Sequence, residues 1–527
     1  MENNTIKFVN ITGDAILQYK SAHPEEMYPP THIFPYTDPG PEASGNEYKN
    51  FDFDIETGNG FKRYKLHWQN AYMIDQWDCQ HFAHEQDGVF KEFLKHDMKV
   101  ESVIDGSLIG NIENYIASQD DTIIFILHRL YSYSLPYSFW RKCHDNGIKV
   151  AIDNSFEAET YSLHKLFFWL HSCFEDTSFV KLLTSQFDNN LPKNYKTIKQ
   201  QIKEHFGIDL VEIDFFILHE QNNKIASTSA HSGPLEYASF EPDKIYVDNK
   251  PKKFLCMNNY MKEHRFFILN YLVNNFDSSG NRLIDNCIAS ARFSLDPNKP
   301  FYNHGVDRTD FEHLNFQSEI ILNESLKQEE FNKTSEYLPI ILDDDLEDNK
   351  HAVNPDLFNN DNSSQYEFRD RWVNWRWYAD TEISLVTESS YTANLVLQKG
   401  IFHQYIPKSD GYPYYDQIPQ EIGFITEKTL KPIMYGHPFL LITHPGTLRH
   451  LRSIGFETFP EWFDESYDEI ELDDERFKSI KQQVTHIANT TLHIEAIKEK
   501  LEHNRQLFFN AKTCAGIYDK LIDDILK

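Results

Sequence analysis

The residues best suited to chemistry are a Glu-Lys pair, Glu427 and Lys428, at the start of a short predicted helix. The surrounding segment, 424–442, has the pattern of a loop, a helix, a Gly turn and a buried strand. The first amide groups of a helix attract anions, and a neighbouring lysine adds a full positive charge. The segment therefore predicts a site for a phosphorylated ligand. An ordinary αβ unit with a solvent-facing Glu-Lys pair would show the same pattern, because fold pattern alone does not determine function.

Two further segments place polar residues directly after predicted strands. In the first, a strand leads into a helix start that carries Lys262, His264 and Arg265. The helix dipole disfavours cations at that end, so their presence favours an anionic partner, and arginine suits bidentate phosphate binding. In the second, a strand ends at Glu388, which could hold a ribose diol, cap a helix or face solvent. Ligands of parallel sheets gather at the carboxyl ends of strands, so we predict that these segments converge.

Along the chain, the strand and helix start with His264 and Arg265 come first, the strand that ends at Glu388 second, and the Phe-Ile-Thr-Glu-Lys run 424–428 third. In this chain order, the three segments resemble the donor-binding half of α-1,3-fucosyltransferases. In that family a strand ending in Phe-Glu-Asn-Ser is followed by Tyr-Ile/Val-Thr/Ser-Glu-Lys, an apolar helix and a strand. The resemblance covers roughly residues 250–460. It implies a two-domain GT-B fold, a GDP-fucose donor held mainly by the C-terminal domain, and inversion of the anomeric centre.

The resemblance also implies roles for individual residues. Arg265 and Lys428 match the family's diphosphate-binding arginine and lysine, and Glu427 matches the glutamate near the ribose and sugar hydroxyls. Phe424 replaces the usual tyrosine, and Glu388 falls where the family has Asn. These departures bear on the base and the sugar more than on the reaction type. The remaining residues of the predicted donor site are Asn258, Lys262, His264, Ser389 and Thr426.

The predicted mechanism follows from the charges that form when a sugar–phosphate bond breaks. Arg265, Lys428 and helix-start amides would stabilise the leaving diphosphate. No metal or other cofactor is required if these cations suffice. The acceptor hydroxyl needs a carboxylate base, which a GT-B enzyme supplies from its N-terminal domain. Our candidate is Glu157, with Asp153 and Glu159 as alternatives; a solvated loop carboxylate would look the same.

The elements that must position these residues alternate between apolar strands and helices, which is typical of parallel sheets covered on both faces. The predicted strands are 7–11, 122–127, 149–153, 211–218, 253–257, 383–386 and 438–442, and the predicted helices include 139–146, 197–206, 264–276 and 447–454. The fold class is therefore α/β. Combined with the resemblance, it is GT-B-like, with two Rossmann-like domains whose sheets face a cleft. We expect an N-terminal acceptor-side domain (1–245), a nucleotide-sugar domain (246–480) with an acidic insertion (324–367), and C-terminal helices (481–527).

Composition narrows the function classes. The net charge of −30 and the lack of a Lys/Arg cluster make nucleic acid an unlikely partner. No apolar run reaches the roughly 18 residues of a membrane span, and the N-terminus has no leader pattern, so we expect a cytoplasmic protein. The six cysteines form no CxxC pair and fit reduced thiols rather than a zinc site. The run Asp343–Asp348 is interpreted as a solvated insertion rather than a metal site.

The expected partners are a nucleotide sugar and a glycan or other hydroxyl acceptor. Three alternatives remain open at this point. One is a glycosyltransferase that modifies DNA bases, which a basic N-terminal cleft would favour. Another is a non-catalytic protein that kept a nucleotide-binding module. The last is an unrelated α/β enzyme in which Glu427 and Lys428 form a helical surface.

Overall fold

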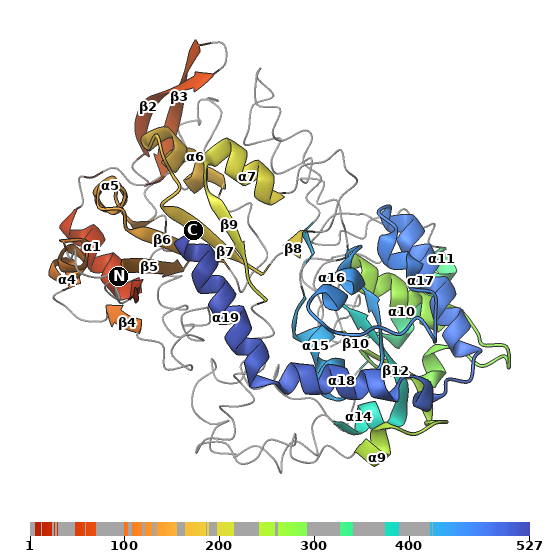
Figure 1. The fold of residues 1–527 in the computed structure, drawn as a ribbon. Helices are drawn as coiled ribbons and strands as arrows, with labels where there is room; N and C mark the ends of the chain where they lie inside the picture. The colour runs from red at the N-terminus through yellow and green to blue at the C-terminus, as the bar shows by residue number, and fades with distance from the viewer. Residues whose placement is uncertain are drawn as a thin grey trace, which may run out of the picture. The chain divides into compact units, whose positions relative to one another are not determined.

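The computed structural model divides the chain into two compact units, which are described separately (Figure 1). Unit 1 comprises Met1–Asn222, Asn394–Ile422 and Cys514–Lys527, and unit 2 comprises Asn223–Ala393 and Gly423–Thr513. The structure describes residues 6–11, 13–23, 26, 29, 48–57, 60–69, 100–103, 108–117, 122–128, 132, 134–154, 164–185, 187–188, 198–214, 242–258, 262–291, 327–340, 375–388, 391, 422–423 and 425–527.

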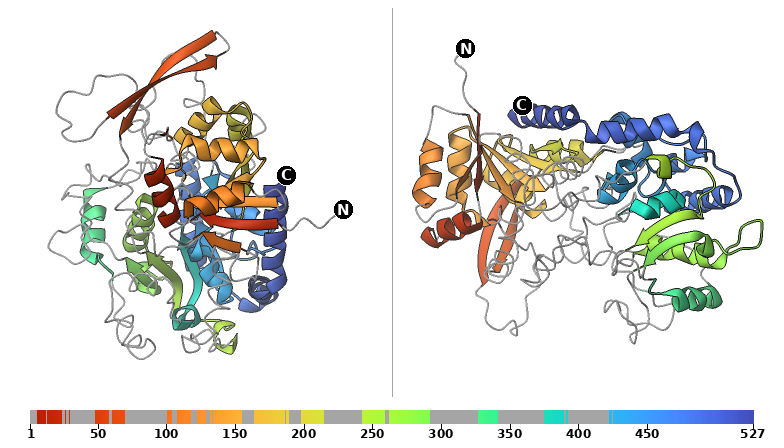
Figure 2. Two further views of the ribbon diagram at one scale, coloured as in Figure 1. Left: turned by 90° about the vertical axis from the view of Figure 1, so that its left-hand side faces the viewer. Right: turned by 90° about the horizontal axis from the view of Figure 1, so that it is seen from below.

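Unit 1 is built on a six-stranded parallel sheet of order β4-β1-β5-β6-β7-β9. Its strands are β1 (Ile6–Ile11), β4 (Val100–Val103), β5 (Thr122–His128), β6 (Lys149–Asn154), β7 (Val180–Thr184) and β9 (Asp209–Glu212). Its helices are α1 (Gly13–Ala22), α4 (Leu108–Ala117), α5 (Tyr137–Asp145), α6 (His164–Cys173) and α7 (Ile198–Phe206). A separate antiparallel hairpin pairs β2 (Tyr48–Thr57) with β3 (Gly60–Gln69), as Figure 2 shows from two sides.

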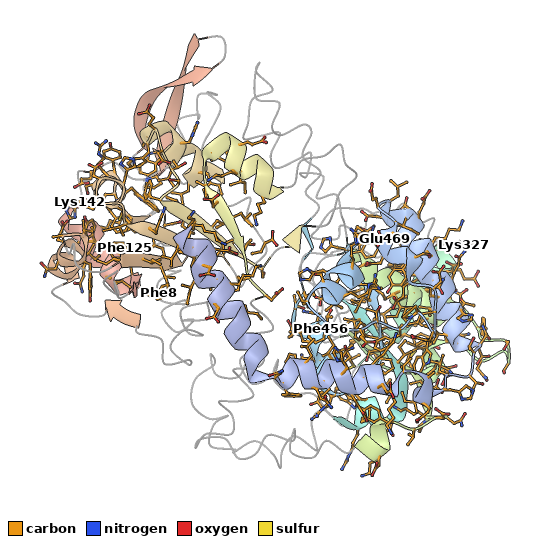
Figure 3. All side chains as sticks on the ribbon, in the orientation of Figure 1. Phe8, Phe125, Lys142, Lys327, Phe456 and Glu469 are labelled. Carbon is orange, nitrogen blue, oxygen red and sulfur yellow. The ribbon has the colours of Figure 1, made fainter. Side chains whose placement is uncertain are left out.

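The sheet of unit 1 is buried among these helices. Phe125, labelled in Figure 3, is fully buried in one core with Phe139 and Trp140 of α5 and Phe167 of α6. Every described residue of β7 is buried, as expected for a central parallel strand covered on both faces. This pattern confirms the prediction of an α/β unit in the first half of the chain.

Unit 2 contains a four-stranded parallel sheet of order β11-β10-β12-β14. The strands are β10 (Lys252–Asn258), β11 (Cys287–Ala291), β12 (Thr381–Thr387) and β14 (Phe439–Ile442). The helices are α9 (Pro242–Ile245), α10 (Glu263–Asn274), α11 (Gln328–Tyr337), α14 (Trp375–Asp380), α15 (Glu427–Met434), α16 (Thr447–Ser453), α17 (Asp473–Ala488) and α18 (Lys498–Phe509), with short 3-10 helices η4 (Ile284–Asn286), η8 (Glu465–Glu469) and η9 (Ile494–Ala496). The remaining elements are α19 (Ala511–Leu526) and the short strands β8 (Phe187–Asp188) and β13 (Ile422–Gly423).

Two predictions of local structure differ from what is observed. The helix predicted at 264–276, α10, ends earlier, at Asn274, and is buried on nearly all sides. α11 covers it: the Phe266 and Phe331 rings lie 5.9 Å apart, and Thr334 Oγ1 donates to Asn270 Oδ1 at 2.7 Å. The covering helix, α11, lies inside the segment 324–367, which was expected to be an acidic insertion. The strand predicted at 211–218 begins earlier, at Asp209.

Candidate functional site

The strand order of unit 2 defines where a ligand would collect. The chain runs from β10 to β11 on one side and then to β12 on the other, so the connections diverge between the ends of β10 and β12. Such a switch point is the usual ligand crevice of an open parallel sheet. Here the two strand ends are joined, because Thr387 Oγ1 donates to Asn258 Oδ1 at 2.6 Å. Both residues are buried, so Asn258 lies at the expected edge but is engaged within the fold.

Glu388, directly after β12, is fully buried, and its carboxylate binds the start of α15. Oε1 accepts from the Thr426 and Thr429 amides at 3.1 and 3.2 Å and from Thr429 Oγ1 at 2.5 Å. Oε2 accepts from Thr426 Oγ1 at 2.6 Å. A carboxylate satisfies the free amides of a helix start and is stabilised by the helix dipole. Glu388 is therefore a helix-capping residue, which is one of the three roles that the sequence left open, and its carboxylate oxygens are engaged within the protein rather than directed at a ribose.

The same contacts correct our expectation for the helix-start amides. The amides of Thr426 and Thr429 are taken by Glu388, and the Lys428 amide donates to Thr426 Oγ1 at 3.3 Å. Thr426 is the N-cap residue of α15. These amides are therefore bound within the protein rather than directed at a ligand.

The start of α10 meets the same residue from the other side. His264 Nε2 and Arg265 Nη2 lie 2.9 and 3.1 Å from the carbonyl oxygen of Glu388. Since a carbonyl only accepts, His264 carries its proton on Nε2. Burial, followed by the positive charge of Arg265, holds the pKa of His264 well below its usual value, so the ring is neutral. The N-cap residue Lys262 is half-buried, and its carbonyl oxygen accepts from the Phe266 amide at 2.9 Å. Its ammonium side chain has no acceptor atom and cannot cap the helix amides.

Glu427 and Lys428 form an ion pair at the start of α15, with Lys428 Nζ 2.7 Å from Glu427 Oε1. The two side chains are 22% and 27% exposed. Burial alone would raise the pKa of Glu427, but the charges of Lys428 and Lys431 and the hydrogen bond from Lys428 hold it at about 2. Glu427 is therefore ionised at neutral pH, and Lys428 retains an accessible surface.

Arg265 interacts electrostatically with Glu427 of this pair and with Glu388. Burial lowers the pKa of Arg265, while the nearby carboxylates of Glu388 and Glu427 oppose that change. The Arg265 side chain is only 3% exposed. The structure thus brings Arg265, Glu388 and the Glu427–Lys428 pair together at the carboxyl edge of the sheet, although they come from three separate segments. In this arrangement Lys428 is the accessible cation and Arg265 a buried one.

Several predicted residues cannot be placed. Ser389, Phe424, Glu157 and Glu159 lie outside the described residues. Asp153, the alternative base, is 6% exposed near the end of β6 in unit 1, where it is in register with His128 and Leu183. The run Asp343–Asp348 also lies outside the described residues.

The sequence analysis missed three buried residues around the site. The Tyr391 ring stacks on His264, with centroids 5.5 Å apart and planes 19° apart, and the Arg476 guanidinium lies 4.4 Å from the centre of the Tyr391 ring. His444 follows β14 and is buried, and its electrostatic interaction with His264 contributes to the low pKa of His264. A polar residue just after a predicted apolar strand was the available signal for His444. Tyr391 and Arg476 gave none, because they reach the site through long-range packing.

Comparison with protein-family models and with curated proteins finds no match for this chain. Among the residues that the structure describes, no three His, Cys, Asp or Glu side chains cluster in a way that could hold a metal ion. None of the helices within the described ranges has the length and apolar character needed to cross a membrane.

Proposed function

We propose that this protein is an inverting glycosyltransferase of GT-B type that uses a nucleotide-diphosphate sugar and needs no metal. The observation that carries the proposal is the convergence of Arg265 and the Glu427–Lys428 pair at the switch point of the unit 2 sheet. The order of the motifs along the chain resembles that of α-1,3-fucosyltransferases. This resemblance favours GDP-fucose or a similar donor and a glycan or other hydroxyl acceptor.

The two cations would act on the leaving group in different ways. Lys428 is partly exposed, so its ammonium can bind a phosphate oxygen directly after giving up part of its contact with Glu427. Arg265 is buried, so it contributes mainly a fixed positive potential. A preorganised charge in a low-dielectric site stabilises the negative charge that develops on the diphosphate, and removal of one such donor costs about 3–4 kcal/mol.

The acceptor hydroxyl must lose its proton as the new bond forms. We propose that a carboxylate of unit 1 takes this proton, with Glu157 or Asp153 as the candidates. Asp153 lies at the carboxyl edge of the unit 1 sheet, which is the functional edge of parallel α/β sheets.

A thermal-shift panel of GDP, UDP, CDP and ADP tests the proposal. A ligand present at about 100 times its dissociation constant adds roughly 2.7 kcal/mol of stability to the folded state. We expect one nucleoside diphosphate, GDP first, to raise the melting temperature. No response to any of the four would instead favour an unrelated α/β protein.

One observation favours a second function, that of a non-catalytic nucleotide-binding protein. Arg265 is 3% exposed and hydrogen-bonded to the Glu388 carbonyl, which also suits a purely structural arginine. Release of nucleoside diphosphate from a panel of nucleotide sugars, measured with mixed glycan acceptors, separates the two functions. Binding without release would support the second.

A further inference from the structure

Glu388 connects the two halves of the candidate site through different atoms. Its carbonyl oxygen lies within hydrogen-bond distance of His264 and Arg265 at the start of α10. Its carboxylate receives the four donors of Thr426 and Thr429, which flank the Glu427–Lys428 pair on both sides. Its amide donates to the Ile442 carbonyl at the end of β14, at 3.2 Å.

We propose that Glu388 is the positioning residue of the donor site. Its carboxyl group occupies the start of α15 and its carbonyl binds the start of α10, so it fixes the positions of Arg265 and Lys428. The inference rests on the proposed function for its catalytic meaning. It also specifies how a diphosphate is bound. Since Glu388 takes the Thr426 and Thr429 amides and Thr426 Oγ1 takes the Lys428 amide, a ligand phosphate would be held by the Lys428 side chain rather than by these amides.

The chemistry of the carboxylate makes this role sensitive to a single atom. Glutamate presents two acceptor oxygens to four donors, whereas glutamine presents one oxygen and an NH2 group. In Glu388→Gln, the NH2 group would face the hydroxyl of Thr426 or the donors of Thr429. The first turn of α15 would then move away from β12 and carry Lys428 with it.

Unit 2 provides a matched control in Asp468, which caps the neighbouring helix α16 in the same way. Its Oδ1 and Oδ2 accept from the Leu448 and Arg449 amides at 3.0 and 3.1 Å, and the residue is 1% exposed. Asp468→Asn also replaces a buried capping carboxylate with an amide, but in a helix that carries neither Arg265 nor Lys428.

The test compares the wild type, Glu388→Gln and Asp468→Asn in two measurements. The first is GDP affinity by titration, for which we expect a loss of at least about tenfold in Glu388→Gln and little change in Asp468→Asn. The second is the rate of reductive methylation of Lys428, read by mass spectrometry against the exposed Lys527. We expect this rate to rise several-fold in Glu388→Gln alone.

The two readouts separate the possible failures. If the wild type binds no nucleotide, the proposed function fails, and the methylation rate alone decides the positioning role. A folded Glu388→Gln protein with the wild-type Lys428 rate overturns the inference. If that variant does not fold, Thr429→Val, which removes only one hydroxyl donor to Glu388, takes its place: a raised Lys428 rate supports the inference, and an unchanged rate contradicts it.

Discussion

The substitution Lys428→Gln removes a partly exposed cation of the candidate site while keeping most of the side chain. Lys428 Nζ lies 2.7 Å from Glu427 Oε1, and the Lys428 side chain is 27% exposed. A phosphate charge about 4 Å from the Lys428 ammonium would be attracted by roughly 4 kcal/mol at an effective dielectric constant of about 20. Because Lys428 is partly exposed, desolvation and screening cancel most of this attraction. The net value of a hydrogen bond to a charged group, about 1.5–3 kcal/mol, is the appropriate measure.

That free energy corresponds to a loss of GDP affinity of about 10- to 150-fold, since 1.4 kcal/mol is a factor of ten. The assay is calorimetric titration of GDP at low and moderate salt. The matched control is Lys431→Gln, which removes the same charge one turn later in α15. We expect the control to lose much less affinity. Equal losses of affinity in the two variants would mean that Lys428 acts only through its charge and does not contact the phosphate.

Lys428→Gln should also change the acid response of Glu427. In the wild type the pKa of Glu427 is about 2, below its ordinary value of 4.5, so its stabilising contribution is complete above about pH 4.5 and is lost as the pH falls toward 2. Without Lys428 the pKa should rise, and this part of the acid destabilisation should shrink. A folded variant with unchanged GDP affinity and an unchanged acid profile would refute the reasoning.

Three further predictions concern the stability of unit 2. Burial lowers the pKa of Lys250 from 10.5 to about 7, so the folded state favours the neutral amine and the protein becomes more stable between pH 7 and 10. Lys250→Met should stabilise the protein at pH 7 by about 1–3 kcal/mol and flatten this rise, as read by hydrogen exchange. The control Lys252→Met should keep the rise. Gly436 has φ of 58°, and a Cβ there would lie 2.4 Å from Tyr246 Oη, so Gly436→Ala should cost more in urea unfolding than Gly280→Ala, where φ is 83° but nothing lies within 4 Å. Burial raises the pKa of Asp468 from 3.8 to about 6, so the folded state favours the protonated carboxyl group. The stability that this protonation contributes is lost as the pH rises from about 4 through 6. Asp468→Asn should remove that pH dependence in thermal melts.

The elements of the fold were largely predictable from the sequence where their signals are local. The apolar runs that form β5, β6 and β14 are continuous, so their strands were found. β7 was missed because Lys181, which is 1% exposed and bonded to Asp209 at 2.6 Å, interrupts its apolar pattern. β11 was missed because its sequence, Cys-Ile-Ala-Ser-Ala, is too small and polar to stand out.

The site shows the same division between local and long-range information. The position of Arg265 at a helix start after a predicted strand, and that of Lys428 at the start of a predicted helix, were visible in the sequence. The sequence left three roles open for Glu388, because its carboxylate binds Thr426 and Thr429, which lie 38 and 41 residues further along the chain. No local pattern distinguishes a carboxylate that contacts a ligand from one that caps a distant helix.

The central claim is that the carboxyl edge of the unit 2 sheet binds a diphosphate through Lys428. A crystal structure of the protein with GDP tests it most directly. We expect a phosphate oxygen about 2.7–2.9 Å from Lys428 Nζ, with the Glu388 carboxylate still on the start of α15. A nucleotide bound elsewhere in the molecule, with the Glu427–Lys428 pair unchanged, would contradict the account.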